Sequence, residues 1–412
     1  MAYANHHRNV DFWRLSDTCA RFCSSTFHLH TLLESRSMFS NLKKTMLNLF
    51  IIFSMTIALL EAALQIYNPI PIRVIAGEFR LIPNGKGTIE NVVGVREGLL
   101  PKLAVKKHNE IGFLGDNLEH FRSADIRIIT IGGSTTECYY LGDGKTWPAQ
   151  MKTHLETLLP GQSVSLINAG LDGHSTFGHI ALLQHFKGIF EQLRPTHILI
   201  MAGINDFGLW DQKPRSYDLR NLEVSLLKKS ILFNLISAYI NADEKWAFRN
   251  DHERVLKWQE HELFSKKEFV QRLRDYEEGQ KQDIEKNIKQ EDGYFSRLKE
   301  ISNLIISIGA SPVLIEQVAA YGDYTDPSTG TDMAALKLGD WSGLTRALAL
   351  EQYNAAMAEV AASNEITFIP LGDFLPNDTK YFYDEVHLGL EGARQVGVIV
   401  ARNISDSLKH QF

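Results

Sequence analysis

Four short blocks of this sequence carry side chains that can act as a nucleophile, a base or a hydrogen-bond donor, and the first three also contain glycine. They span residues 131–137, 168–176, 203–206 and 384–387. The first carries the hydroxyl of Ser134, and the last carries the carboxylate of Asp384 and the imidazole of His387. A hydroxyl becomes a nucleophile when an adjacent base takes its proton, and a third group orients that base. These residue types therefore predict acyl transfer through a serine.

Each block also has an ordinary structural explanation when it is taken alone. Ser134 and Glu137 have the spacing of a capping box, in which the hydroxyl only satisfies the end of a helix. An asparagine such as Asn205 is common in turns, and the pattern of Asp384 and His387 is short. The four blocks together are more specific, because each follows a predicted strand or lies close to one.

Five apolar, β-branched runs supply the strands that position these blocks, at residues 126–131, 164–168, 197–203, 312–317 and 366–370. Their near-continuous apolarity, with helical patterns between them, is typical of parallel strands that helices cover on both faces. Ligands bind such sheets at the carboxyl ends of the strands, where the first three blocks lie. Residues 391–409 are expected to form the closing helix.

The chemistry expected in such a crevice follows from the groups themselves. A neutral His387 takes the proton of Ser134 as the hydroxyl attacks an ester carbonyl, and Asp384 holds the ring and stabilises the imidazolium. The same imidazole then protonates the leaving alcohol. Developing negative charge on the carbonyl oxygen needs hydrogen-bond donors, and losing one of them typically lowers the rate about 100- to 1000-fold.

The four blocks resemble the signature blocks of the SGNH, or GDSL-type, hydrolase superfamily, over about residues 125–405 without a helical insertion. The resemblance implies a flavodoxin-like three-layer α/β/α sandwich and a serine esterase or a related acyl-transfer enzyme, with no metal or other cofactor. Ser134 matches the nucleophile, Gly173 and Asn205 match two donors of the oxyanion hole, and Asp384 and His387 complete the triad.

The blocks depart from the family pattern at two places. Gly132 and Gly133 precede Ser134 where most members have Gly-Asp, and this form resembles a membrane-anchored bacterial branch of the superfamily. The missing aspartate matches no catalytic role. Gly389 stands where many members have a capping residue, so we expect a looser loop around His387.

Other residues near the blocks have simpler interpretations. His174 is expected to be a solvated turn histidine, and Asp206 to be a helix cap. Cys138 is expected to be a small buried hydrophobic residue.

One apolar stretch differs from the rest of the chain. Residues 46–67 match the length that a helix needs to cross the hydrocarbon core of a bilayer. Lys43 and Lys44 precede this stretch, so the positive-inside rule predicts a cytoplasmic N-terminus and an extracytoplasmic domain after Pro69. A cleaved signal peptide is the alternative, and Met38 is an alternative start of translation.

These patterns divide the chain into a cytoplasmic tail at 1–44, a transmembrane anchor at 45–67, a connecting segment at 68–124 and a hydrolase-like domain at 125–412. Within that domain, dense charge at about 215–300 predicts a helical insertion with a narrow apolar seam. The seam is expected to pack against its own domain, and a partner-binding coiled coil is the alternative.

Composition excludes several classes of function. The chain has 412 residues, 44% of them hydrophobic, and a net charge of −6, which offers no field for binding nucleic acid. Its three cysteines, at positions 19, 23 and 138, form neither a disulfide framework nor a zinc pattern.

The sequence therefore predicts a membrane-anchored extracytoplasmic esterase that deacylates a carbohydrate or another small ester, with an acylated glycan or a lipid as substrate. An O-acyltransferase acting on a cell-surface glycan is an alternative that uses the same triad. A non-catalytic binding module on the same fold, with the insertion as its partner surface, is the third hypothesis.

Overall fold

The computed structural model describes residues 41–64, 66, 74–75, 78–79, 81, 83–91, 98–209, 213–215, 218, 230–233, 236 and 261–409. The chain divides into two compact units, Met1–Asn68 and Pro69–Phe412. The described part of the first unit is a helix, Asn41–Leu64, with 24 residues and a mean hydropathy of 2.0 in its apolar window. It overlaps the predicted segment and is the one described helix whose length and composition suit a membrane span. The expected cytoplasmic tail is 1–44: residues 1–40 lie outside the described residues, and residues 41–44 belong to this helix.

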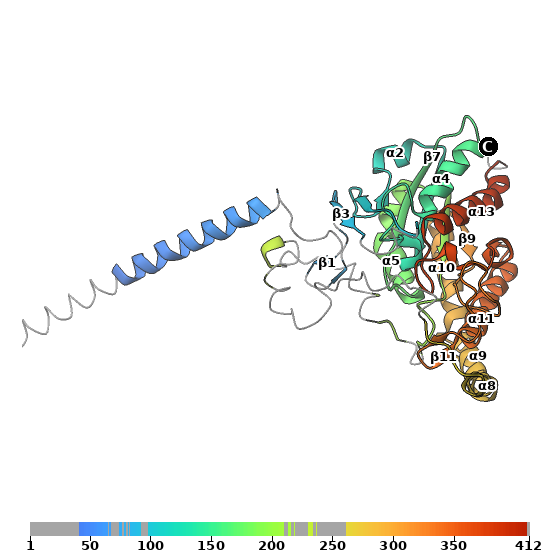
Figure 1. The fold of residues 1–412 in the computed structure, drawn as a ribbon. Helices are drawn as coiled ribbons and strands as arrows, with labels where there is room; N and C mark the ends of the chain where they lie inside the picture. The colour runs from blue at the N-terminus through green and yellow to red at the C-terminus, as the bar shows by residue number, and fades with distance from the viewer. Residues whose placement is uncertain are drawn as a thin grey trace, which may run out of the picture. The chain divides into compact units, whose positions relative to one another are not determined.

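A six-stranded sheet forms the centre of the second unit (Figure 1). Its strands stand in the order β12 (Thr367–Ile369), β9 (Ser311–Ile315), β8 (His197–Met201), β6 (Ile126–Gly132), β7 (Val164–Gly170) and β5 (Leu114–Gly115). All neighbours are parallel except β5, which pairs with β7 in the antiparallel sense. The five predicted strands are confirmed. Numbered along the chain, they follow the order 2-1-3-4-5 of flavodoxin-like folds.

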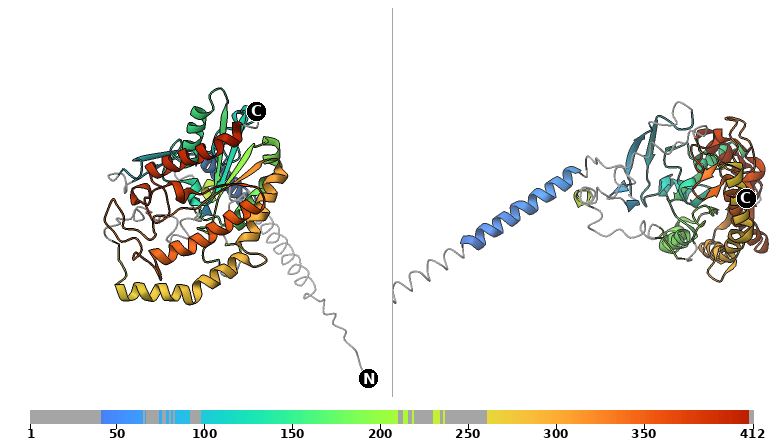
Figure 2. Two further views of the ribbon diagram at one scale, coloured as in Figure 1. Left: turned by 90° about the vertical axis from the view of Figure 1, so that its right-hand side faces the viewer. Right: turned by 60° about the horizontal axis from the view of Figure 1, so that its bottom comes forward.

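Helices cover both faces of this sheet, so the unit has the three layers that the sequence predicts (Figure 2). One face carries α4 (Trp147–Leu158) and α13 (Leu390–Lys409). The other carries α5 (Thr176–Leu193), α10 (Tyr294–Ile308) and α11 (Gly343–Ser363). Side chains of a strand alternate between faces, and accordingly Ile128 lies in the first core whereas Ile129 lies in the second.

The apolar residues of the closing helix α13 form a stripe that packs against the sheet. Four of its fully buried residues recur at every fourth position: Val396, Val400, Ile404 and Leu408. Burying one such side chain stabilises a fold by about 1.5–3 kcal/mol, so this stripe holds the helix on the sheet. The helix begins just after His387, and its packing therefore also fixes the end of the loop that carries the imidazole.

The segment before β6 adds elements that the sequence patterns leave out. β1 (Val74–Ile75) pairs with β2 (Glu78–Phe79), and β3 (Lys86–Glu90) pairs with β4 (Leu103–Lys107). β5 joins the edge of the main sheet, and α2 (Leu118–Ser123) follows it. Later in the chain come β10 (Lys337–Leu338), β11 (Trp341–Ser342), α12 (Leu371–Phe374) and the 3-10 helix η5 (Thr379–Tyr381).

The charged segment is helical where the structure describes it, and most of residues 216–260 lies outside the described residues. α8 (Lys266–Asp275), the π-helix η4 (Tyr276–Gln280) and α9 (Lys281–Lys289) form one continuous run, drawn in yellow in Figure 2. Tyr276, Ile284 and Ile288 are buried in the same core as α5 and α11, so the seam packs against its own domain. Residues 294–300, which the charge pattern assigns to the insertion, instead begin α10, the helix that leads into β9.

We expect the crossing of α4 and α13 to be sensitive to a single methyl group. A Cβ at Gly397 would lie 2.6 Å from Cβ of Gln150 and 2.8 Å from the carbonyl oxygen of Trp147. Gly397→Ala should therefore lower the free energy of unfolding by about 1–3 kcal/mol. Gly188 in α5 has open space around it, so Gly188→Ala should raise stability by about 0.4–1 kcal/mol. Denaturant titration of the full-length protein in detergent measures both, and equal effects would contradict the close crossing.

Candidate active site

The nucleophile candidate lies where the strand order of the sheet reverses. From β6 the chain passes to β7 on one side and then to β8 on the other, and such a reversal opens a crevice at the carboxyl ends of the strands. Ser134 begins the four-residue helix α3 (Ser134–Glu137) directly after β6. The N-cap of this helix is Gly133, and no side chain caps it. The capping-box interpretation of Ser134 is therefore wrong, because the hydroxyl is directed elsewhere.

The hydroxyl of Ser134 faces the imidazole of His387, a residue that is distant in the chain. Its Oγ lies 2.7 Å from Nε2 of His387, and Nδ1 of the same ring lies 2.7 Å and 2.9 Å from the two carboxylate oxygens of Asp384. A carboxylate only accepts hydrogen bonds, so Nδ1 carries the proton of the neutral ring and the lone pair of Nε2 faces the hydroxyl. This arrangement allows the imidazole to take the hydroxyl proton.

The carboxylate of Asp384 is held in its charged form. Burial raises its pKa, but the charge and hydrogen bond of His387 and the backbone N–H groups of Val386 and His387 together hold the pKa below the ordinary value of 3.8. Those N–H groups donate to Oδ1 at 3.0 Å and 2.8 Å. The charge therefore persists at neutral pH and favours an imidazolium beside it.

An aromatic ring and a closed turn fix the orientation of His387. The ring of Tyr383 stacks on the imidazole, with ring centroids 5.4 Å apart and planes 8° apart. The backbone N–H of Tyr383 donates to the carbonyl of His387 at 3.0 Å, which closes the turn. Tyr383 escaped the sequence analysis, and its only signal was an aromatic residue directly before Asp384.

The backbone after His387 is pinned rather than loose at Gly389. The N–H of Gly389 donates to the carbonyl of Tyr381 at 2.8 Å, and that of Leu390 donates to the carbonyl of Leu99 at the same distance. A Cβ at Gly389 would lie 3.0 Å from that carbonyl oxygen of Leu99. The glycine therefore accommodates a neighbouring segment, which explains its presence better than a flexible loop does.

The loop after β7 contains Gly173, the residue that the sequence predicts as a backbone donor. Gly173 has a φ of +74°, which side-chain-bearing residues rarely adopt. Side chains from the two neighbouring loops hold the residues beside it: Glu137 accepts from the N–H of Asp172 at 2.9 Å, and Asn205 donates to the carbonyl of His174 at 3.1 Å. In the part of the chain that the structure describes, the N–H groups of Gly173 and Ser134 meet no acceptor, so both are available to a ligand.

The side-chain amide of Asn205 lies against Gly133, the residue before Ser134. It can do so because Gly133 has no side chain. A Cβ at Gly133 would lie 2.3 Å from Nδ2 of Asn205 and 3.2 Å from the carbonyl oxygen of His174. The amide nitrogen carries two protons, and one of them goes to that carbonyl. The other is left for a bound group. The fold thus joins Ser134, His387 and Asp384 directly and places Asn205 beside them.

His174 follows the predicted donor Gly173 in the chain, and Asp206 follows the predicted donor Asn205. His174 is 1% exposed, so the expectation of a solvated histidine is wrong. Its ring turns under α5, where a Cβ at Gly178 would lie 2.7 Å from it. Asp206 begins no helix among the described residues; its carboxylate instead accepts hydrogen bonds at 3.2 Å from the N–H of Thr176, the first residue of α5. Burial lowers the pKa of the adjacent His179 to about 3, which keeps that ring neutral.

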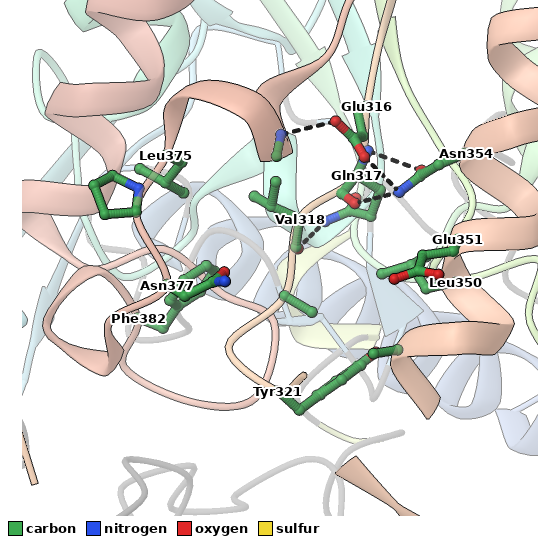
Figure 3. Close-up of a pocket in the computed structure, with 14 residues that line it drawn as sticks. Glu316, Gln317, Val318, Tyr321, Leu350, Glu351, Asn354, Leu375, Asn377 and Phe382 are labelled. Atoms are coloured by element: carbon green, nitrogen blue, oxygen red, sulfur yellow. Dashed lines mark hydrogen bonds between the residues drawn. The ribbon is translucent and has the colours of Figure 1, made fainter. Parts of the chain in front are cut away.

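A cavity of about 140 Å³ lies at the carboxyl ends of β9 and β12 (Figure 3). Glu316 and Glu351 line it, and burial raises the pKa of both carboxyl groups. Gln317 also lines it and accepts a hydrogen bond from the hydroxyl of Thr135 at 3.0 Å. One side chain therefore links this cavity to the residue that follows Ser134.

Among the described residues, no group of three or more His, Cys, Asp or Glu side chains is arranged to hold a metal ion.

Comparisons with known proteins return hydrolases. No protein-family model matches the sequence, and no curated protein matches it. Among solved structures, the chain is similar to Axe2, an acetylxylan esterase from Geobacillus stearothermophilus, with 16% identity and a TM-score of 0.36 over 68% of this chain and 94% of that one. It is also similar to LAE5, an alpha/beta hydrolase enzyme from the metagenome of Lake Arreo, Spain, with 15% identity and a TM-score of 0.38 over 70% and 99%.

A third solved structure is a lipolytic protein assigned to the G-D-S-L family from Desulfitobacterium hafniense DCB-2, with 10% identity and a TM-score of 0.33 over 67% of this chain and 98% of that one. Identities and TM-scores this low carry no information about activity, which depends on the geometry of the site.

We expect Cys138, four residues after Ser134, to be inert in the folded protein. Burial raises the pKa of its thiol to about 12, and the thiol donates a hydrogen bond to the carbonyl of Thr135. Iodoacetamide at pH 8 should therefore leave Cys138 unmodified until a denaturant is added, because the thiolate is the reactive form. Peptide mapping by mass spectrometry separates this residue from Cys19 and Cys23. Rapid modification of the folded protein would contradict the burial.

Proposed function

We propose that this protein is an SGNH-type serine esterase that works through an acyl-enzyme. One observation supports the proposal above the others: two consecutive hydrogen bonds connect the hydroxyl of Ser134 through the imidazole of His387 to the carboxylate of Asp384. In a purely structural network, the side chains are fully buried and inaccessible to a substrate. Here Ser134 and His387 remain partly exposed, and the side chain of His387 has 17% of its surface accessible.

The proposed reaction begins when the oxygen of Ser134 attacks the carbonyl carbon of an ester. Nε2 of His387 takes the hydroxyl proton, and the charge of Asp384 stabilises the imidazolium. The tetrahedral intermediate collapses with cleavage of the bond to the alcohol, which leaves with the proton of His387. Water then attacks the acyl-enzyme by the same route, and the acid product and free Ser134 are formed.

We propose that three hydrogen-bond donors stabilise the oxyanion of the intermediate. They are the N–H groups of Ser134 and Gly173 and the second amide proton of Asn205. Donors that need no rearrangement when the charge develops are the most effective, because no reorganisation cost falls on the transition state. Two hydrogen bonds support this role: the N–H of Asp172, next to Gly173, donates to Glu137, and the amide of Asn205 donates to the carbonyl of His174.

We further propose that the helix Asn41–Leu64 anchors the enzyme and that its catalytic unit lies outside the cytoplasm. Lys43 and Lys44 at the start of this helix support that orientation through the positive-inside rule. An enzyme tethered there meets the acylated glycans and lipids of the cell surface. We therefore propose an acyl group on a carbohydrate, or another small ester, as the substrate.

Hydrolysis of p-nitrophenyl acetate by the full-length protein in detergent tests the proposal. Ser134→Ala should lower the rate by at least about 1000-fold, because residual catalysis then comes only from binding and the oxyanion donors. Cys138→Ala is the matched control and should retain activity. A fluorophosphonate should attach to the peptide that contains Ser134. Turnover that survives Ser134→Ala, or attachment at another residue, would contradict the assignment.

The rate of this hydrolysis should fall as the pH drops below about 6, because an imidazolium cannot take the proton of the hydroxyl. The pKa of Asp384 lies below 3.8, so this carboxylate stays charged across that range and cannot cause the decline. A pH profile of kcat/KM measures the effect. A profile that stays flat down to pH 5 would show that His387 is not the base.

A further inference from the structure

A buried ion pair lies directly behind the proposed oxyanion donors. Nη2 of Arg297 is 3.2 Å from Oδ1 of Asp206, and these side chains are 4% and 1% exposed. Arg297 belongs to α10, whereas Asp206 belongs to the turn after β8. Burying two charges is costly unless the geometry is good and further hydrogen bonds satisfy them. We therefore ask which neighbouring groups this ion pair holds in position.

The guanidinium of Arg297 is satisfied on several sides. Its Nε donates to the hydroxyl of Thr176 at 2.6 Å, and its Nη1 donates to the carbonyl of Asp292. The group also lies over the ring of Phe177, 4.1 Å from the centroid. A planar fork with five donors can make these contacts at once, and a lysine ammonium cannot.

The carboxylate of Asp206 ties together the two loops that carry the donors. Asp206 follows Asn205 directly in the chain. Its oxygens accept from both the N–H and the hydroxyl of Thr176, three positions after Gly173. One charged group therefore sets the position of the turn that bears the amide donor and of the loop that bears the backbone donor.

The charge of Asp206 depends on Arg297. Burial raises the pKa of Asp206, and the guanidinium together with the hydrogen bonds of Thr176 opposes that rise. Without the guanidinium, the pKa of this carboxyl group would rise further, which favours its protonated form and removes an acceptor site. The hydrogen bonds to Thr176 would then weaken.

We infer that the ion pair of Arg297 and Asp206 positions the oxyanion donors Asn205 and Gly173, so that both charged residues are positioning residues for the reaction. This inference rests on the proposed esterase function and deepens it. Arg297 lies in the densely charged part of the chain, where the sequence suggests only solvated helix. It acts through Asn205 and Gly173 and touches no reacting atom.

A double-mutant cycle with p-nitrophenyl acetate tests the inference. Arg297→Lys keeps the charge and loses the fork, and it should lower kcat about 10- to 100-fold with KM changed less than about twofold. Asn205→Ala should lower kcat about 100- to 1000-fold. If Arg297 acts through the donors, then Arg297→Lys should lower kcat less in the Asn205→Ala protein than in the wild-type protein, because only its effect through Gly173 remains.

Two further variants keep the test decisive. Lys289→Met removes a cation from an exposed ion pair with Glu285 and should leave kcat unchanged. If Arg297→Lys does not fold, Thr176→Val removes the shared hydroxyl without a change of charge and should show the same coupling to Asn205. Thermal unfolding well above the assay temperature confirms that each variant is folded.

The outcomes separate the two proposals. Full additivity of Arg297→Lys and Asn205→Ala, or a loss that appears in KM with kcat unchanged, would overturn the positioning role while Ser134→Ala still abolishes activity. Turnover that does not need Ser134 would instead overturn the esterase proposal itself. A coupled loss of kcat in protein that depends on Ser134 would support both.

Discussion

The hydrogen bond of 2.7 Å between the hydroxyl of Ser134 and Nε2 of His387 is the interaction on which the proposed activity depends. It joins residues that are 253 positions apart in the chain. A serine hydroxyl is a poor nucleophile at neutral pH, so without this contact the turn after β6 would be an ordinary helix start. The rest of the domain can be understood as the structure that brings one hydroxyl and one ring nitrogen into contact.

Strand order does most of that positioning. The hydroxyl follows β6, the central strand at which the order reverses, and the amide of Asn205 follows β8, its neighbour. The imidazole comes from a loop that α13 fixes against α4 on one face of the sheet. Small side chains then set the distances, because Gly133 admits the amide of Asn205 to within 2.3 Å of where a Cβ would stand.

Features with a local signature could be predicted from the sequence. The five parallel strands and α13 follow from apolar runs and helical spacing, and the blocks that carry Ser134, Gly173, Asn205, Asp384 and His387 follow from residue type and from family resemblance. β5 was missed because two residues are too few to show a period. The start of α10 falls within the predicted insertion because Arg297, Lys299 and Glu300 continue the run of charged residues before it.

The remaining differences are long-range. Ser134 and Glu137 fit a capping box locally, but His387 competes for the hydroxyl and no local pattern contains that competitor. His174 was expected to be solvated because turns usually lie at the surface, whereas α5 covers this one. The pairing of Arg297 with Asp206 likewise depends on which helix lies over which loop.

A crystal structure of the protein after reaction with a phosphonate inhibitor would test the central claim most directly, because the tetrahedral phosphorus adduct resembles the proposed intermediate. The account predicts a covalent bond from phosphorus to Oγ of Ser134. It also predicts one phosphonyl oxygen within about 2.7–3.1 Å of the N–H groups of Ser134 and Gly173 and of Nδ2 of Asn205. An adduct whose oxygen points away from these donors, or one that forms at another residue, would contradict it.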